Sequence, residues 1–353
     1  MTTTKIAVYG ATGHTGSYLL TELHRRGITP ILVGRSTSRM RAAAVAAGVP
    51  DAEIRVAALT DHDALVAAFE GADVVISSLS AYVDNGEPVL AAAIAAGAHY
   101  TDLSGEQLFL KRVFDEYGAQ AEAAGVTVIP GVTDNNVAGD LLAHLSARRL
   151  TGPVEIVLSH LSKSGGNGSK GSAKTVFASL DWFRSGGWHF QDGELRTGPT
   201  ARHAEMTFPG HTAPTAVAKF PQPPVLTIPR HTDVSCVAGV LDTAILDLLG
   251  SFTEEIIESL PDDPSSDLRY DVVVDAYDAN GHSARGVVSG VDSYRDSALA
   301  AIEIALRLAK GTTEPGTLSV AEAFDAEELL DALARFDITW HITDQHRHPA
   351  PTD

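Results

Sequence analysis

Short apolar runs alternate with longer segments of helical period along the first part of the chain, up to residue 148. Strands that are buried on both faces of a parallel sheet give apolar runs of this kind, and helices join them. The predicted strands are Lys5–Tyr9, Pro30–Val33, Ile54–Ala58, Ala72–Leu79, His99–Leu103 and Val126–Pro130. We therefore predict an α/β domain over residues 1–148, with a doubly wound parallel sheet of the Rossmann type.

Beyond this domain the hydrophobic pattern changes to an alternation of apolar and polar residues. Pro153–His160 has the period of two that is typical of a half-buried strand. Tyr270–Tyr277 and His282–Val288 flank Asn280–Gly281, a dipeptide that favours a hairpin turn. We predict a second α+β domain over residues 149–293, built on an antiparallel sheet.

The composition suits two soluble domains and restricts the partners. Hydrophobic residues make up 44% of the 353-residue chain and charged residues 20%, as in ordinary globular proteins. With 26 Lys and Arg residues against 45 Asp and Glu residues, the formal net charge is −19. We therefore expect neither a nucleic acid nor a membrane as a partner, since anionic partners need a basic surface.

Several features favour a cytoplasmic protein. Cys236 is the single cysteine, so no disulfide forms within the chain, which fits a reducing compartment. The N-terminus lacks the pattern of a signal peptide, and no apolar run approaches the roughly 20 residues that span a bilayer. The histidines show no spacing typical of a metal site, so we expect no metal. The polar residues 342–353 are expected to form a disordered tail.

A glycine-rich loop follows the first predicted strand and precedes the first predicted helix. In it, Gly10 permits a tight turn, Gly13 lets the backbone approach a pyrophosphate, and Gly16 lets helix and sheet pack closely. The N–H groups at the start of the helix bind phosphates in such loops. Further side-chain donors are Thr12, His14 and Thr15. The alternative is a tight strand–helix turn that binds no ligand.

The end of the second predicted strand indicates which dinucleotide binds. NAD sites usually carry an acidic residue about 20 residues beyond the glycines, where it binds the ribose hydroxyls. This chain has Arg35 and Ser36 there, with Arg39 close behind. Arginine pairs with a 2′-phosphate and stacks on adenine, so we predict NADP(H) as the cofactor. The alternative is that Arg35 and Arg39 are solvated residues at a helix start.

A second motif resembles a known family. Gly97–Glu106, with the sequence GAHYTDLSGE, is similar to the G-x-x-Y-x-D-L-x-G-E stretch of the saccharopine dehydrogenase-like reductases, which include the bacterial trans-acting enoyl reductases. Val126–Asp140, Ser164–Ser172 and Thr317–Leu333 resemble later segments of that family. The resemblance implies an inserted antiparallel substrate domain and C-terminal helices, within residues 294–340, that return to complete the NADP-binding domain.

Candidate catalytic residues follow from the sheet topology, because ligands of open parallel sheets bind at the carboxyl ends of the strands. Ser78 and Leu79 follow the fourth strand and are expected to contact the cofactor. Tyr82 is either a proton donor or an aromatic packed under the cofactor. Asp102 and Glu106 are each candidates to hold the nicotinamide ribose or to act as general acid. The alternative is a helix start, in which Ser104 and Gln107 form a capping box and Glu106 suits the helix dipole.

Four residues are candidates for binding the substrate. Asn135 and Asn136 either orient the substrate or cap the helix that begins near them. Lys163 and Lys174 flank a Gly/Ser-rich loop and either bind an anionic substrate or are solvated loop charges.

The motifs together, with the resemblance, predict an NADPH-dependent oxidoreductase that reduces a C=N or C=C bond of a small metabolite by hydride transfer. We expect a homodimer. One alternative is an NADP-sensing regulator without turnover. Another is a short-chain-type ketoreductase, which needs a Tyr-x-x-x-Lys pair that is not found between residues 120 and 200.

Overall fold

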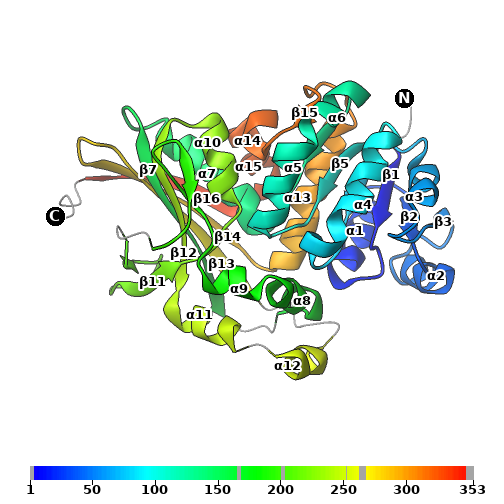
Figure 1. The fold of residues 1–353 in the computed structure, drawn as a ribbon, viewed down its shortest axis with the longest axis horizontal. Helices are drawn as coiled ribbons and strands as arrows, with labels where there is room; N and C mark the ends of the chain where they lie inside the picture. Colours follow the sequence, from blue (N-terminus) through cyan, green and yellow to red (C-terminus); the bar gives the residue numbers. More distant parts are fainter. Residues whose placement is uncertain (1–3, 165–167, 200–202, 252, 262–267, 347–353) are drawn as a thin grey trace. The chain divides into compact units, whose positions relative to one another are not determined.

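The structure is a computed structural model, and it describes residues 4–164, 168–199, 203–251, 253–261 and 268–346. The chain forms two compact units, and Figure 1 labels their elements where there is room. The first unit comprises the residues up to Ser104, Leu108–Asp134 and Tyr294–Leu318. The second unit comprises Gly105–Gln107, Asn135–Ser293 and the residues from Ser319 onward.

The first unit is built on a parallel sheet. Its strands are β1 (Ile6–Tyr9), β2 (Ile31–Gly34), β3 (Ile54–Val56), β4 (Val74–Ser77), β5 (His99–Asp102), β6 (Thr127–Ile129) and β15 (Gly316–Thr317). Within the described residues they pair in the order β15-β6-β5-β4-β1-β2-β3, and every pair is parallel. The strand order reverses between β1 and β4, which is where ligands bind in such sheets. The predicted Rossmann-type α/β fold is confirmed.

Helices connect these strands and cover the sheet. They are α1 (His14–Arg25), α2 (Thr37–Ala46), α3 (His62–Phe69), α4 (Tyr82–Ala95), α5 (Gln107–Glu116), α6 (Gly118–Ala124) and α13 (Ser293–Leu308). The buried residues of α1 lie at intervals of three and four, as on the inner face of a helix. Among them, Leu19, Leu20 and Leu23 are fully buried.

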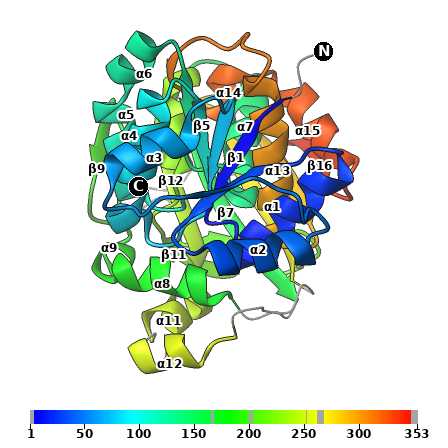
Figure 2. The same ribbon diagram turned by 90° about the vertical axis from the view of Figure 1, so that its right-hand side faces the viewer.

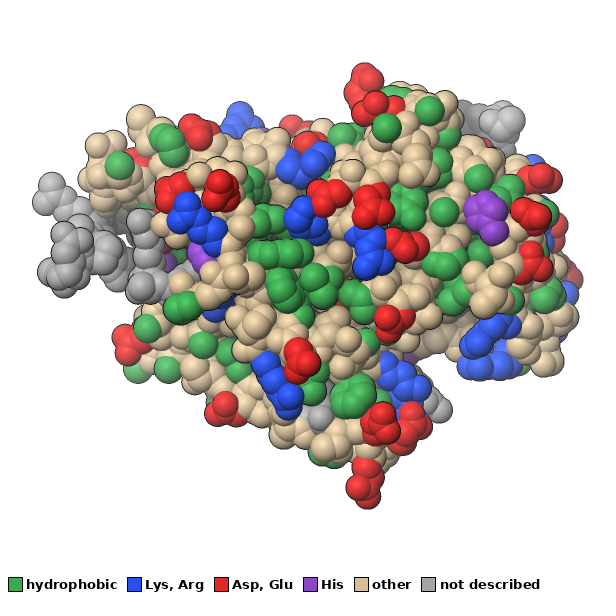
Figure 3. Space-filling view, viewed as in Figure 1, with side chains coloured by type: hydrophobic (Ala, Val, Ile, Leu, Met, Phe, Trp, Pro, Cys, Tyr) green, Lys and Arg blue, Asp and Glu red, His purple; other side chains and the backbone are tan. Residues whose placement is uncertain are grey.

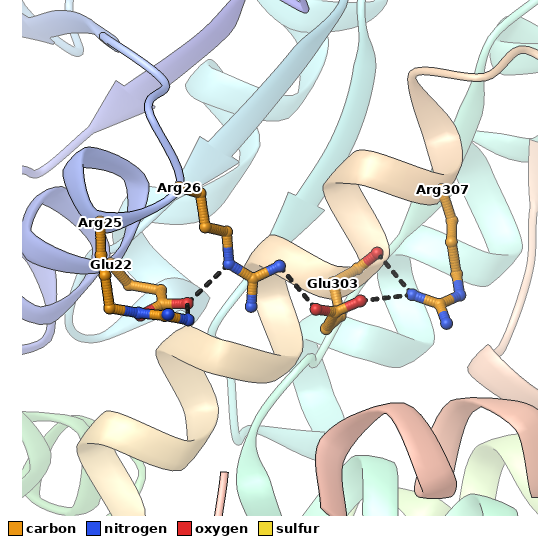
Figure 4. A network of polar contacts seen from close by, with 5 residues as sticks. All are labelled: Glu22, Arg25, Arg26, Glu303 and Arg307. Carbon is orange, nitrogen blue, oxygen red and sulfur yellow. Dashed lines mark hydrogen bonds and ion pairs between the residues drawn. The ribbon is translucent and has the colours of Figure 1, made fainter. Parts of the chain in front are cut away.

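Helix α13 comes from the C-terminal part of the chain and lies beside α1 (Figure 2). Arg26 Nη1 lies 2.5 Å from Glu303 Oε1, and Arg26 Nε lies 2.6 Å from Glu22 Oε1 (Figure 4). At the other end of α1, the rings of His14 and Tyr294 lie 4.8 Å apart. Helix α13 therefore supports α1, and with it the glycine loop, at both ends.

The second unit is built on a larger sheet. Its strands are β7 (Val154–Ser164), β8 (His189–Gln191), β9 (Glu194–Arg196), β10 (Glu205–Met206), β11 (Thr215–Lys219), β12 (Val234–Asp242), β13 (Arg269–Tyr277), β14 (His282–Gly290) and β16 (Thr339–His346). Its helices are α7 (Asp134–Ala147), α8 (Lys170–Ala178), α9 (Leu180–Arg184), α10 (Pro224–His231), α11 (Thr243–Gly250), α12 (Glu254–Ser259), α14 (Val320–Ala323) and α15 (Ala326–Ala334). The hairpin predicted at Asn280–Gly281 joins β13 and β14 and is confirmed.

Two expectations about the second unit need correction. Its sheet is mixed, because β12 runs parallel to β7 while its other paired strands are antiparallel in the described residues. The chain between β7 and β12 passes through helices and short strands, so β12 returns in the same direction as β7. Residues 342–346, expected in a disordered tail, belong to β16, which pairs with β14. Residues 347–353 of that tail lie outside the described residues.

The C-terminal helices divide between the two units. Helix α13 from Tyr294 onward belongs to the first unit, whereas α14 and α15 belong to the second. Two contacts join α14 to the rest of the second unit: Ala321 N donates to Asp140 Oδ2 at 2.9 Å, and Arg230 Nε lies 2.8 Å from Glu322 Oε2. None of the helices in the described parts of the chain is long and apolar enough to cross a membrane.

Candidate cofactor site

The glycine loop connects β1 to α1, and two of its glycines are required by close backbone contacts. Gly10 has a φ of 87°, and a Cβ atom there would lie 2.1 Å from the carbonyl oxygen of Ser78. A Cβ atom at Gly16 would lie 2.6 Å from the carbonyl oxygen of Gly10. Gly13 is exposed, and a Cβ atom there would meet no backbone atom closer than 3.5 Å. Its missing side chain therefore leaves the backbone open to a ligand.

The start of α1 suits an anion. Gly13 is its N-cap residue and makes no side-chain cap bond, and the first turn contains no acidic residue. The N–H groups and the dipole of a helix N-terminus attract phosphate groups. Thr12, His14 and Thr15 are half-buried around this helix start. The arrangement is the cradle that a dinucleotide pyrophosphate needs.

A cavity of about 330 Å³ lies in the first unit at the carboxyl ends of its strands. Its lining includes most of the predicted cofactor residues, namely Gly10, Thr12, Gly13, Arg35, Ser36, Arg39, Ser78 and Leu79. His14, Thr15 and Gly16 belong to the start of α1 and are not part of this lining. The structure therefore brings together the loop after β1, the end of β2 and the loop after β4.

The lining also includes residues that the sequence analysis missed. Leu59 follows β3 and Asn85 lies in the first turns of α4. The position of Leu59 beyond a strand end was a usable signal, because loops at the carboxyl edge of the sheet share one side. Asn85 gave no such signal, since it lies within a helix and not at a strand end.

The end of β2 is basic. Arg35 follows the last residue of β2, and both Arg35 and Arg39 are exposed. Ser36 caps α2, and its Oγ accepts a hydrogen bond from the Arg39 N–H at 3.4 Å. No carboxylate is among the described residues that line the cavity. Two guanidinium groups and a hydroxyl suit the 2′-phosphate of NADP(H).

Tyr9 lines the cavity, and the charge of Arg35 affects the pKa of its hydroxyl. Burial raises the pKa of the Tyr9 hydroxyl, and the positive charge of Arg35 opposes part of that rise. The Tyr9 hydroxyl donates to the carbonyl oxygen of Ala57 at 3.4 Å. Tyr9 therefore lines the cavity as a neutral, hydrogen-bonded side chain.

The hydroxyl of Tyr82 is buried and fully engaged with the backbone. It donates to the carbonyl oxygen of Ser77 at 2.7 Å and accepts from the N–H groups of Leu79 at 2.9 Å and Leu103 at 3.3 Å. Burial and the nearby Asp102 carboxylate raise its pKa far above the ordinary value. Tyr82 therefore joins the loops that follow β4 and β5.

Asp102 ends β5 and is fully buried. Its Oδ1 accepts from Ser104 N at 2.9 Å, Ser104 Oγ at 2.6 Å and Gly131 N at 2.8 Å. Burial raises the pKa of the Asp102 carboxyl, although these hydrogen bonds oppose the rise. Asp102 therefore fastens the loop after β5 to the loop after β6.

The other predicted site residues belong to the second unit. Glu106 is 3% exposed and its Oε2 accepts from Gly105 N at 2.9 Å. Asn135 and Asn136 lie in the first turn of α7, with Asn136 5% exposed. Lys163 lies on β7, 2.8 Å from the buried Asp271, and Lys174 lies on α8, 3.4 Å from the exposed Glu258.

The second unit also contains a lysine with a lowered pKa, Lys219, that the sequence did not indicate. Burial lowers the pKa of Lys219 to about 8. Its Nζ donates to the carbonyl oxygens of Gly187 at 2.6 Å and Gly198 at 2.8 Å. The sequence carried no signal for the lowered pKa of Lys219, because its side chain reaches these carbonyl oxygens only in the folded protein.

Comparison with known proteins identifies the first unit. Residues 6–129 match the sequence model of the saccharopine dehydrogenase NADP binding domain. A trans-acting enoyl reductase of Mycobacterium tuberculosis is 32% identical over 148 residues, which are 41% of this chain and 35% of the relative. A lipid droplet localized protein of Caenorhabditis elegans is 28% identical over 189 residues, which are 50% of this chain and 44% of the relative. The chain thus spans less than half the length of these two relatives.

One solved structure shares the fold over nearly the whole chain. It is the apo form of saccharopine dehydrogenase (L-Glu forming) from Saccharomyces cerevisiae, with a TM-score of 0.64 and 12% sequence identity. The match covers 97% of this chain and 100% of that chain. Residues 6–129 therefore belong to the saccharopine dehydrogenase NADP-binding domain family, as the sequence predicted, and the cofactor of this domain is NADP(H).

Proposed function

We propose that the protein is an NADPH-dependent oxidoreductase that transfers hydride to a carbon–carbon or carbon–nitrogen double bond of a small molecule. The observation that carries this proposal is the cavity, whose lining combines the glycine loop with the basic end of β2. The family of residues 6–129 and the enoyl reductase relatives support the same reaction class.

The residues of the cavity hold the cofactor in this proposal. The backbone at Gly13 and the start of α1 bind the diphosphate, and Arg35 with Ser36 binds the 2′-phosphate. NADPH supplies the hydride, while the protein orients it and excludes water.

The type of bond is open between two alternatives. The relatives named as trans-acting enoyl reductases favour the C=C bond of an enoyl group. Reduction of a C=N bond is the other alternative. An assay with a short 2-enoyl thioester and with a cyclic imine as probes separates them through the loss of absorbance of the reduced nicotinamide. If NADPH is oxidised with neither of the two probes, that result would favour an NADP-binding regulator instead.

We also propose a division of roles among the catalytic candidates. Tyr82 and Asp102 act as positioning residues, because their polar atoms bind the backbone of neighbouring loops. The predicted donor role of Glu106, and the substrate roles of the lysines and asparagines in the second unit, stay predictions. The homodimer and the cytoplasmic location also stay predictions, and sedimentation of the purified protein tests the first.

The first experiment concerns the choice of cofactor. Titration calorimetry with NADPH and NADH should show tighter binding of NADPH to the wild-type protein. Arg35→Asp should weaken NADPH binding by roughly 10- to 100-fold, since a charge-assisted hydrogen bond is worth about 1.5–3 kcal/mol. NADH binding should change little.

Arg112→Asp is the matched control for this experiment. It makes the same change in net charge in the same unit, but Arg112 pairs with Glu87 and is not part of the cavity lining. Equal affinity of the wild-type protein for NADPH and NADH would contradict the proposed role of Arg35.

A further inference from the structure

The turn after β4 contains a strained residue. Ala81 has φ 52° and ψ 62°, the left-handed conformation that residues with a Cβ atom rarely adopt. It is buried and directly follows Ser78, Leu79 and Ser80, which line the cofactor cavity. Strain of this kind persists only where surrounding contacts hold it, and it is concentrated at binding sites.

Asn85 makes side-chain hydrogen bonds to this turn. Its Nδ2 donates to the carbonyl oxygens of Ser80 at 3.0 Å and Ala81 at 3.1 Å. The backbone N–H groups of Asp84 and Asn85 also donate to the Ala81 carbonyl oxygen, at 3.1 Å and 3.0 Å. The amide of Asn85 thus closes the turn from within the first turns of α4.

The turn is also coupled to the glycine loop. Ser78 N donates to the carbonyl oxygen of Tyr9 at 2.8 Å. The carbonyl oxygen of Ser78 occupies the space that a side chain at Gly10 would need. A shift of Ser78 would therefore change the path of the backbone that faces the diphosphate.

We propose that Asn85 is a positioning residue for the cofactor. Its amide holds the turn Ser78–Ala81, with Ala81 in its strained conformation, so that the cavity is shaped before NADPH enters. A site that is ordered in advance binds more tightly, because less freedom is lost on binding. This inference rests on NADP(H) occupying the cavity. It assigns Asn85 to the part of the cavity that NADPH and NADH share.

The test is titration calorimetry of Asn85→Ala with NADPH and with NADH. We expect both affinities to fall by a similar factor, roughly 5- to 30-fold for two lost hydrogen bonds. The preference for NADPH should stay unchanged, in contrast to Arg35→Asp, which should remove it. The double variant Asn85→Ala with Ala81→Gly should recover part of the affinity, because glycine adopts the left-handed conformation without strain.

Gln120→Ala is the control. It removes a neutral amide of the same unit whose Nε2 donates to a carbonyl oxygen, that of Glu116 at 3.0 Å, and Gln120 does not line the cavity. Its affinity for NADPH should equal that of the wild type.

Two negative outcomes are distinguishable. If the wild-type protein binds NADPH but Asn85→Ala binds it within twofold of the wild type, the role of Asn85 is wrong and the cofactor site stands. If the wild-type protein binds neither dinucleotide, the cofactor role of the cavity fails and the role of Asn85 fails with it.

Discussion

At the scale of single residues, the glycines differ in what they contribute. Gly10 combines a positive φ with a near contact to the Ser78 backbone, whereas Gly97 has a φ of 70° and open space where a Cβ atom would lie. The first position tolerates no side chain for two reasons, and the second is restricted only by its backbone conformation.

Substitution of these two glycines separates the effects. Gly10→Ala should lower the free energy of unfolding by roughly 3 kcal/mol or more and abolish NADPH binding, because its Cβ atom would clash with the carbonyl oxygen of Ser78 in the turn after β4. Gly97→Ala should cost about 1 kcal/mol, the left-handed penalty alone. Circular dichroism during urea unfolding measures the free energy of unfolding of both variants. Equal losses for the two variants would show that the contact with Ser78 has no energetic weight.

At the scale of helices, a buried pair of ionisable side chains connects elements of the second unit. His231 Nε2 on α10 lies 2.9 Å from Asp140 Oδ1 on α7, and both side chains are at most 5% exposed. Thr227 Oγ1 and Ala321 N also donate to Asp140. Burial opposes both charges, but the attraction between them raises the pKa of His231 and lowers the pKa of Asp140. The pair therefore joins α7, α10 and α14.

The stability of these helices should depend on pH with a definite sign. Because the pKa of His231 is raised, its contribution is fully present below the ordinary value of 6.5 and is lost as the pH rises through the raised value. The contribution of Asp140 is present above its ordinary value of 3.8 and is lost as the pH falls through the lowered value. His231→Gln should cost roughly 3 kcal/mol at pH values near 6, as for other broken buried pairs, and less in alkaline solution.

Tryptophan fluorescence during urea unfolding measures the free energy of unfolding of the second unit, because Trp182, Trp188 and Trp340 all belong to it. His282→Gln is the control. His282 pairs with Asp278 at 3.1 Å but its side chain is 67% exposed, so the loss should stay below about 1 kcal/mol. A loss for His231→Gln that does not change with pH would argue against the charged pair.

At the scale of the whole molecule, the cofactor cavity belongs to one of two units. Figure 3 shows basic side chains scattered between acidic ones over the face that it draws, in keeping with the net charge of −19. The basic residues that matter for the cofactor are therefore local, at the end of β2.

Hydrogen exchange should report this division. NADPH at 100 times its dissociation constant should slow exchange in the first turn of α1 and in residues 35–39 and 78–80 by up to about 100-fold, because binding suppresses local opening by that ratio. The hairpin of β13 and β14 should exchange as before. Protection of that hairpin without protection of the glycine loop would place the cofactor in the second unit.

The sequence by itself determined the Rossmann-type sheet, the glycine loop and the choice of NADP(H). Each of these depends on short-range features: strand and helix periods, the conformational needs of Gly10, and the side chains of Arg35 and Ser36 directly after a strand. The tertiary structure alone decided the parallel pairing of β12 with β7, the strand β16, and the turn that Asn85 holds around Ala81. The two strand pairings depend on backbone hydrogen bonds between segments far apart in the sequence, and every residue type except proline can donate them. The turn depends on the side-chain amide of Asn85, which meets the carbonyl oxygens of Ser80 and Ala81 only in the folded chain.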